Sequence, residues 1–171
     1  MQRGFTLIEM LVVAAIIGLL TTTVALTLSS NSRQAAASDA RRLATLLETA
    51  IAEAQAGRRQ IAWSAREGGY DFFAAEPSVD RTSHTPHTPR WTPLGDDETF
   101  HARQLDNGVR IARVEVDGQP LPPGGLLVLR RGDPPLFRIV LEPDNDGSNR
   151  AIELRGLPTG QVEVRDEGKE E

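Results

Sequence analysis

The stretch RGFTLIEMLVVAAIIGLL, residues 3–20, places a single acid, Glu9, at the start of a long apolar run. No charged residue follows between Met10 and Ser32. The 19 residues of Met10–Leu28 would form a helix about 28 Å long, which is close to the hydrocarbon thickness of a bilayer. A soluble amphipathic helix would carry a charged face at helical spacing, and this run has none. The run therefore predicts a helix that inserts into a membrane.

Glu9 argues against an ordinary secretory signal peptide. Such a signal has a basic start, an apolar core of about 7–15 residues and a small-x-small cleavage site. Here the apolar run is longer, and its end at Thr21–Val24 offers no clean site of that kind. An acid at the centre of a membrane helix costs on the order of 3 kcal/mol. Glu9 lies near one end, where the cost is smaller, but it still needs a compensating interaction.

Two interactions could stabilise Glu9 at this position. A helix that begins near Phe5 presents free N–H groups and a positive dipole end, which favour a carboxylate in its second turn. Cleavage between Gly4 and Phe5 would also create an α-amino group one helical turn from Glu9. In a packed array of such helices, the amine of one chain could then pair with the carboxylate of its neighbour and set the axial register.

The segment GFTLIE, residues 4–9, followed by the apolar run, resembles the class III signal of type IV pilins and type II secretion pseudopilins. The resemblance implies that a prepilin peptidase cuts after Gly4, the last leader residue. It further implies that Phe5 becomes the N-methylated first residue of the mature chain, and that Glu9 is the carboxylate that guides filament assembly.

Residues 31–57 have the pattern of an amphipathic helix. Its apolar residues recur at i, i+3, i+4 and i+7. They are Leu43, Leu46, Leu47, Ala50, Ile51 and Ala54. The opposite, exposed face is expected to carry Asp39, Arg41, Arg42, Glu48 and Glu53. With Gly57 as a C-terminal stop, the pattern predicts one helix from Phe5 to Ala56.

From Ile61 onward the pattern predicts β-strands. Residues 60–73 indicate two strands joined at Gly68-Gly69, and the alternation in residues 109–116 slips near Ala112. The aromatic side chains are expected in the core of a small domain. They are Trp63, Tyr70, Phe72, Phe73, Trp91, Phe100 and Phe137. The expected fold class is α+β, a long N-terminal helix, transmembrane in its first half, packed on a small antiparallel β-sheet domain.

Five later segments resemble the H-type minor pseudopilin of the type II secretion system. They are DARRLATLLETAIAEA, RWTPLGDDETFHARQLDNGVRI, VEVDGQPL, LFRIVLEP and AIELRGLPTGQVEV. The expected organisation is a leader peptide (1–4), a transmembrane and assembly helix (5–30), an amphipathic helix (31–57), a periplasmic β domain (58–164) and a charged tail (165–171).

The resemblance implies a structural subunit with no enzymatic activity and no cofactor. It would lie near the tip of a pseudopilus and bridge other minor pseudopilins to the major pseudopilin during export of folded proteins across the outer membrane. Its other partners would be the prepilin peptidase and the inner-membrane assembly platform. The chain would cross the bacterial inner membrane once, with a cytoplasmic N-terminus and a periplasmic C-terminal domain. The alternatives are a minor pilin of a type IV pilus or competence system and a membrane-anchored periplasmic binding module.

The composition argues against several other classes of protein. The chain has no cysteine, which excludes thiolate zinc sites, Fe–S clusters and cysteine nucleophiles. Its formal net charge of -5, without a basic stripe, gives no indication of a nucleic-acid partner. A tethered enzyme could use the acids Asp96, Asp97 and Glu98, but no nucleophile motif or phosphate loop accompanies them.

One segment has the spacing of a calcium loop. Counted from position 142, acids fall at loop positions 1, 3, 5 and 12 and a glycine at position 6, as in an EF-hand. These acids are Glu142, Asp144, Asp146 and Glu153. However, the flanks indicate strands rather than helices, and Asn145-Asp146-Gly147 is a strong hairpin turn. A hairpin is therefore expected here and no metal site, with the loop retained only as a calcium candidate.

Overall fold

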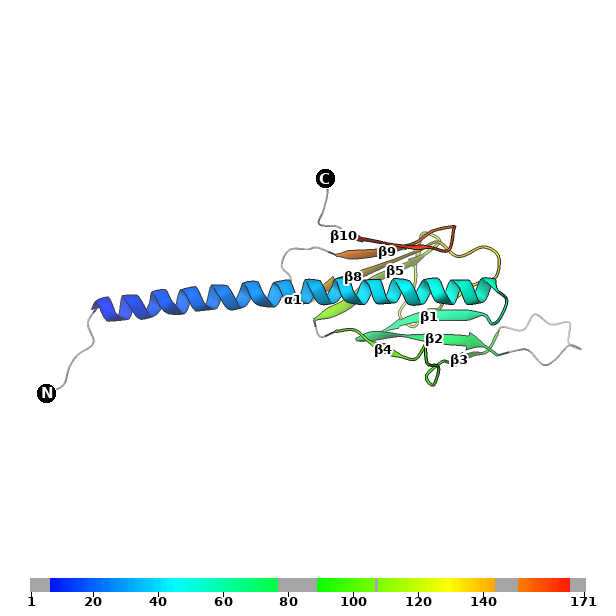
Figure 1. The fold of residues 1–171 in the computed structure, drawn as a ribbon, viewed down its shortest axis with the longest axis horizontal. Helices are drawn as coiled ribbons and strands as arrows, with labels where there is room; N and C mark the ends of the chain where they lie inside the picture. Colours follow the sequence, from blue (N-terminus) through cyan, green and yellow to red (C-terminus); the bar gives the residue numbers. More distant parts are fainter. Residues whose placement is uncertain (1–6, 77–88, 107, 144–150, 167–171) are drawn as a thin grey trace, which may run out of the picture.

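The computed structural model describes residues 7–76, 89–106, 108–143 and 151–166, apart from the side chains of residues 19–31. Helix α1 (Leu7–Gln55) is 49 residues long, so its axis runs for roughly 74 Å. Its N-terminal half projects beyond the β domain, and its C-terminal half lies along that domain (Figure 1). The expectation of one long helix is therefore confirmed over the described residues.

The exposure of apolar side chains changes along α1. Leu7, Ile8 and Leu11 are 84%, 71% and 62% exposed. From Ala36 onward the helix buries one face at the predicted spacing. That face consists of Ala36, Ala40, Leu43, Ala44, Leu46, Leu47, Ala50, Ile51 and Ala54. Among the residues described, no helical stretch combines the length and the apolar character that crossing a membrane requires.

Helix α1 ends at the glycine that the sequence indicates. Gly57 has a φ of 69°, which a glycine adopts without the steric cost that a Cβ would bring. The Gly57 amide donates to the Ala54 carbonyl at 3.1 Å, and the Arg58 amide donates to the Glu53 carbonyl at 3.3 Å. This pair of bonds is a Schellman motif, which satisfies two of the last carbonyls of the helix.

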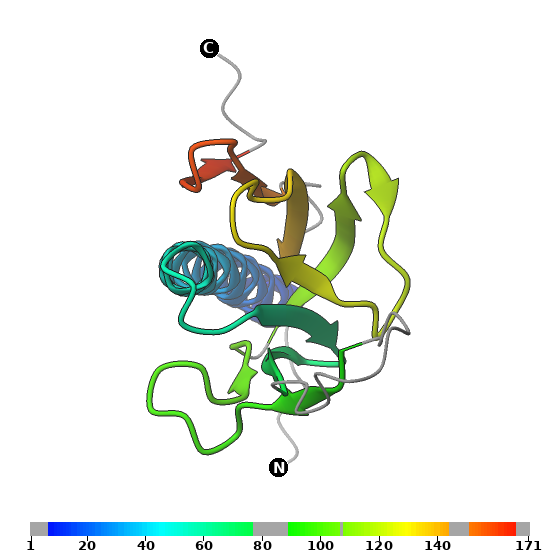
Figure 2. The same cartoon turned by 90° about the vertical axis from the view of Figure 1, so that its right-hand side faces the viewer.

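The first sheet lies under the C-terminal half of the helix, next to its final turns (Figures 1 and 2). Its strand order is β3-β2-β1-β7, with β4 paired to β2. The strands are β1 (Ile61–Arg66), β2 (Gly69–Ala75), β3 (Trp91–Pro93), β4 (Arg103–Gln104) and β7 (Leu127–Leu129). All of these pairings are antiparallel. The buried rings of Trp63, Tyr70 and Phe72 contact one another in tilted and edge-to-face arrangements, and Phe100 from the loop before β4 packs against Phe72.

The second sheet has the order β10-β9-β8-β5-β6 and is also antiparallel throughout. Its strands are β5 (Val109–Val116), β6 (Gln119–Pro120), β8 (Phe137–Pro143), β9 (Ile152–Gly156) and β10 (Val162–Asp166). One face packs against α1 through buried side chains. These are Phe137, Ile139, Leu141, Ile152 and Leu154. The two sheets and the helix thus share one hydrophobic core, and the α+β architecture is confirmed.

Local expectations for the β domain are mostly met. Strands β1 and β2 form a hairpin in which Arg66 pairs with Gly69, and the register of β5 shifts between Ile111 and Arg113, at the predicted slip. Trp63, Tyr70, Phe72, Phe100 and Phe137 are buried, as expected. Phe73 and Trp91 are only half-buried, so their assignment to the core is wrong. Phe73 follows the buried Phe72 on β2 and so lies on the other face of the sheet, and Trp91 is on the edge strand β3.

Candidate functional site

Glu9 lies in the first turn of α1, and its side chain is exposed. A carboxylate at this place interacts favourably with the positive end of the helix dipole. Gly4 and Phe5 lie outside the described residues. The cleavage site, the methylated residue and the assembly role of Glu9 therefore stay predictions.

The helix surface around Glu9 is apolar. Besides the first residues of the helix, the exposed large side chains here are Met10, Leu11, Val12, Val13, Ile16 and Ile17. Soluble monomers seldom leave so continuous an apolar surface in water, and larger patches mark contacts with a partner or a membrane. This half of α1 is therefore the surface that the fold leaves for an external contact.

A buried carboxylate, Asp39, fixes the other half of α1 to the β domain. Its side chain is 1% exposed and accepts a hydrogen bond of 2.8 Å from the Asp106 amide. The Arg42 guanidinium donates to its other oxygen at 2.5 Å and also donates to the Gln104 carbonyl at 3.1 Å. The segment that leaves β4 is thus bound to the helix by two side chains one turn apart.

The expectation that Asp39 lies on the exposed face of α1 is wrong. The segment after β4 covers it, because the Asp106 amide reaches over the helix at that point. Burial raises the pKa of the Asp39 carboxyl above its usual value, against the lowering effects of the Asp106 amide and Arg42. Sequence periodicity could not find this contact, because its partners are 67 residues apart.

Arg59 fixes the C-terminal end of α1 in a similar way. Its guanidinium donates to Glu53 at 3.0 Å and to Asp97 at 2.8 Å, and it lies 5.4 Å from the centre of the Phe100 ring. Asp97 also accepts hydrogen bonds from the amides of Thr99 and Phe100, at 2.9 and 3.0 Å. Asp97 therefore has a structural role in a turn.

The pKa of Asp97 reflects this role. Partial burial raises the pKa of its carboxyl, but the hydrogen bonds from the Phe100 amide, Arg59 and the Thr99 amide outweigh burial. The net result is a pKa below the ordinary value of 3.8.

The last strand is attached to the helix at two points. The Val162 amide donates to the Glu48 carboxylate at 2.8 Å, and Arg33 pairs with Asp166 at 2.5 Å. Glu48 is exposed, as expected, but its carboxylate holds the edge of β10. These contacts align β10 with the helix axis (Figure 1).

The candidate calcium loop is only partly within the described residues, since Asp144 and Asp146 lie outside them. Glu142 on β8 pairs with Arg110, and Glu153 on β9 pairs with Arg138 at 2.8 Å and Arg155 at 2.9 Å. Strands β8 and β9 are antiparallel neighbours, as a hairpin connection requires. Within the described part of the chain, no group of three His, Cys, Asp or Glu side chains is arranged to hold a metal ion.

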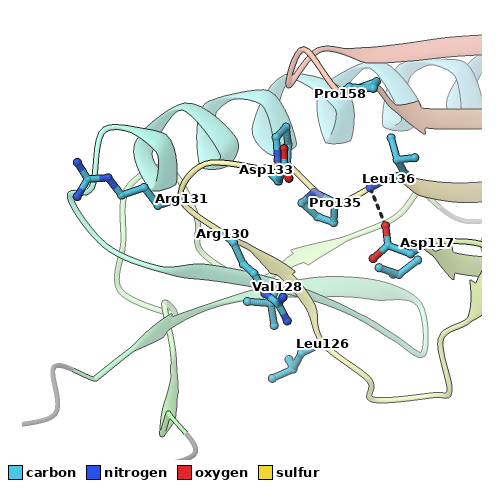
Figure 3. A pocket seen from close by; sticks show the side chains of 11 residues that line it. Asp117, Leu126, Val128, Arg130, Arg131, Asp133, Pro135, Leu136 and Pro158 are labelled. Atoms are coloured by element: carbon cyan, nitrogen blue, oxygen red, sulfur yellow. Dashed lines mark hydrogen bonds between the residues drawn. The ribbon is translucent and has the colours of Figure 1, made fainter.

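A hollow of about 540 Å³ lies near the end of α1, between the β7–β8 connection and the turn after β5 (Figure 3). Val116, Leu126, Val128 and Leu136 supply apolar walls, and the Asp117 carboxylate accepts a hydrogen bond from the Leu136 amide at 3.2 Å. Arg130 and Arg131 lie at its rim, and neither forms an ion pair with another described residue. Asp117 and Asp133 supply the acidic groups among its lining residues.

Comparison with known proteins gives one match for the N-terminal segment and another for the fold. The prokaryotic N-terminal methylation motif matches residues 1–25. A solved structure of the minor pseudopilin EpsH from the type II secretion system of Vibrio cholerae matches with a TM-score of 0.60 and 13% identity, and it covers 81% of this chain and 98% of that chain. The chain has the fold of the minor pseudopilin EpsH.

A second EpsH structure gives the same result, with a TM-score of 0.56 and 13% identity over 78% of this chain and 98% of the EpsH chain. No curated protein sequence matches the chain. The EpsH fold and the methylation motif together support the resemblance to an H-type minor pseudopilin that the sequence indicates.

Proposed function

We propose that the protein is an H-type minor pseudopilin of a type II secretion system. The observation that carries this proposal is the combination, on one chain, of an N-terminal methylation motif with the fold of EpsH. Neither feature is sufficient alone, because the motif is shared with pilins and a fold can host several functions.

In this role the protein is a structural subunit near the tip of the pseudopilus. It bridges the tip complex of other minor pseudopilins to the major pseudopilin below, while folded proteins are exported across the outer membrane. The subunit contributes surfaces rather than chemistry, and its partners include the prepilin peptidase and the inner-membrane assembly platform. Support comes from the exposed apolar half of α1, which is available for contacts with neighbouring helices.

The proposal assigns a function to each part of the chain. Residues 1–4 are removed by the peptidase after Gly4, and Phe5 is methylated. Residues 5–30 insert into the inner membrane and later into the filament, where Glu9 pairs with the N-terminal amine of a neighbour. Residues 31–57 attach the periplasmic β domain, expected over residues 58–164 with a charged tail at 165–171. Strand β10 continues to Asp166, so Arg165 and Asp166 belong to the domain rather than to the tail. Among the described side chains of α1, Ala36 is the first that is buried, which supports a change of environment in this part of the helix.

The membrane assignment rests on the sequence around Glu9. Met10–Leu28 has 19 residues and no charge, and the described side chains at its start are exposed and apolar. An N-terminus on the cytoplasmic side and a periplasmic C-terminal domain follow from the orientation that prepilin processing requires.

Intact-mass spectrometry of the protein from membranes of its own cells tests the proposal. With the prepilin peptidase present, the expected product begins at Phe5 and carries one additional methyl group. In cells without the peptidase, the expected product begins at Met1. A chain that begins at Met1 in both strains would contradict the proposed function and leave only a membrane-anchored module.

A further inference from the structure

The outer face of the second sheet, which points away from α1, is densely charged. The strand registers place Arg110 opposite Glu142, and Glu115 opposite Arg138. They also place Arg165 opposite Glu153. This surface, here called the arginine face, has nine charged residues among those described. They are Arg110, Arg113, Arg138, Arg155 and Arg165, with Glu115, Glu142, Glu153 and Glu163.

Four of the five arginines of this face are more exposed than any of its glutamates, and Arg138 is the exception. The side chains of the five arginines are 33–62% exposed, whereas those of the four glutamates are 5–40% exposed. Glu153 is the extreme case, since it lies buried beneath the guanidinium groups of Arg138 and Arg155, at 2.8 and 2.9 Å. Arg138 and Arg155 stand directly opposite each other, a destabilising pair that Glu153 bridges. A partner approaching this face therefore meets guanidinium groups first.

A hollow of about 390 Å³ lies within the arginine face. Its walls include Arg110, Arg113 and Arg138 with a single carboxylate, Glu142. Its other lining residues are small or apolar: Ala112, Val140 and Ala151. The bulge of β5 lies at Ala112 and shifts the register of the strand beside the hollow. Each of these arginines pairs with a glutamate of the same face: Arg110 with Glu142, Arg113 with Glu115 and Arg138 with Glu153. A guanidinium has five N–H donors, so an acidic side chain that enters the hollow would share these arginines with their present partners.

With five arginines and four glutamates, this face has a formal charge of +1 in a chain whose net charge is -5. The protein has 19 basic and 24 acidic side chains, so a random surface would be acidic. Arginine is also the charged residue most enriched at protein interfaces, where its planar group makes directed contacts. The four interspersed glutamates would repel a uniform polyanion such as nucleic acid or an anionic bilayer. The arginine face is thus better suited to a protein segment with a few spaced carboxylates.

We propose that the arginine face of β5, β8, β9 and β10 is a docking surface for an acidic segment of a neighbouring subunit. This inference rests on the proposed function, since it is the filament that supplies the neighbour. The docking surface lies on the side of the sheet opposite α1. It can therefore bind a second partner while the helix remains in contact with other helices.

The test places a photo-crosslinking amino acid at Ala112, an exposed residue in the hollow, in the full-length protein in its own cells. The expected product is a crosslink to another pseudopilin, within a peptide that contains Asp or Glu. The charge-reversed double variant Arg113→Glu/Arg165→Glu should lower its yield about tenfold, as loss of a few interfacial charge contacts does. The matched control, Arg130→Glu/Arg131→Glu, makes the same charge change at the hollow of Figure 3 and should leave the yield unchanged.

Three results would overturn the docking proposal. They are a crosslink from Ala112 to residues 167–171 of its own chain, a crosslink to lipid, and an equal yield in the two double variants. If the charge-reversed variant fails to fold, the double variant Arg113→Gln/Arg165→Gln takes its place. It removes the same positive charges without adding acids. A second crosslinker at Leu11 separates this proposal from the proposed function. Crosslinks to other pseudopilins at Leu11 but not at Ala112 would reject only the docking surface, and none at either position would reject both.

Discussion

Two stretches of helix α1, residues 7–18 in its N-terminal half and residues 36–54 in its C-terminal half, both carry apolar side chains, yet the described chain covers only the second. In the C-terminal half, Leu43 and Leu47 are fully buried against the two sheets, whereas Ile8 and Leu11 in the N-terminal half are mostly exposed. A buried leucine contributes to folding of its own chain, while an exposed one contributes only when something else covers it. The same helix therefore serves the stability of the subunit at one end and contacts outside the subunit at the other.

Leu47→Ala and Leu11→Ala should differ most in their effect on folding. Leu47→Ala removes a fully buried side chain and should lower the free energy of unfolding by about 2–5 kcal/mol. Leu11→Ala should change it by less than about 0.5 kcal/mol, since most of this side chain is exposed and it lies outside the core. Urea unfolding of both variants in the same detergent measures the difference. Equal losses would show that the two halves contribute alike to folding.

Asp39→Ala should have the next largest effect. It leaves the Asp106 amide without its acceptor and the Arg42 guanidinium with only the Gln104 carbonyl, which should cost about 1–3 kcal/mol of unfolding free energy. Asp39→Asn keeps an oxygen that can accept from the Asp106 amide, so it should lose less. Thermal unfolding of the two variants is the measurement, and a larger loss for Asn than for Ala would contradict the role of Asp39 as an acceptor.

The pH dependence of stability should reveal Asp97. Its pKa is lowered in the folded protein, so its contribution to stability is present above pH 3.8 and is lost as the pH falls through the folded pKa. The pKa of Asp39 is raised instead, so the effect of its titration on stability has the opposite pH dependence: its contribution is lost as the pH rises above 3.8. Asp97→Asn should therefore flatten the loss of stability between neutral and acidic pH. A profile as steep as that of the unmodified protein would assign the acid sensitivity to other groups.

Glu9→Ala should have the smallest effect on folding and the clearest effect on assembly. Glu9 is exposed in the first turn of α1, far from the core, so the free energy of unfolding should change by less than about 0.5 kcal/mol. Crosslinking between helices through Leu11 should nevertheless be lost, because the proposed partner of the N-terminal amine is removed. Glu9→Asp keeps the charge and serves as the control. Unchanged crosslinking in Glu9→Ala would remove Glu9 from the assembly mechanism.

Features set by neighbouring residues could be predicted from the sequence. Gly57 ends the helix because its own conformation does so, and the β1–β2 hairpin forms at a local glycine pair. Even the bulge of β5 is visible as a break in alternation near Ala112. In each case the signal and the structure lie within a few residues of one another.

Contacts between distant segments could not be predicted in the same way. Asp39 has the sequence pattern of an exposed helical residue, and only the segment that ends at Asp106 makes it a buried one. The exposure difference between the arginines and glutamates of the second sheet likewise depends on the pairing of four strands. For the candidate site, Gly4 and Phe5 rest on the motif alone, while the position of Glu9 in the first turn is described by the structure.

The two attachments of β10 to α1 have a mechanical consequence. Arg33 holds Asp166, Glu48 holds the Val162 amide, and the strand runs along the helix between these points. A force applied along the helix axis acts in shear on both attachments and on the hydrogen bonds between β10 and β9. It does not peel these bonds apart one at a time. Bonds loaded in shear must yield together. The subunit can therefore transmit axial thrust from its helix to its sheet as a stiff body.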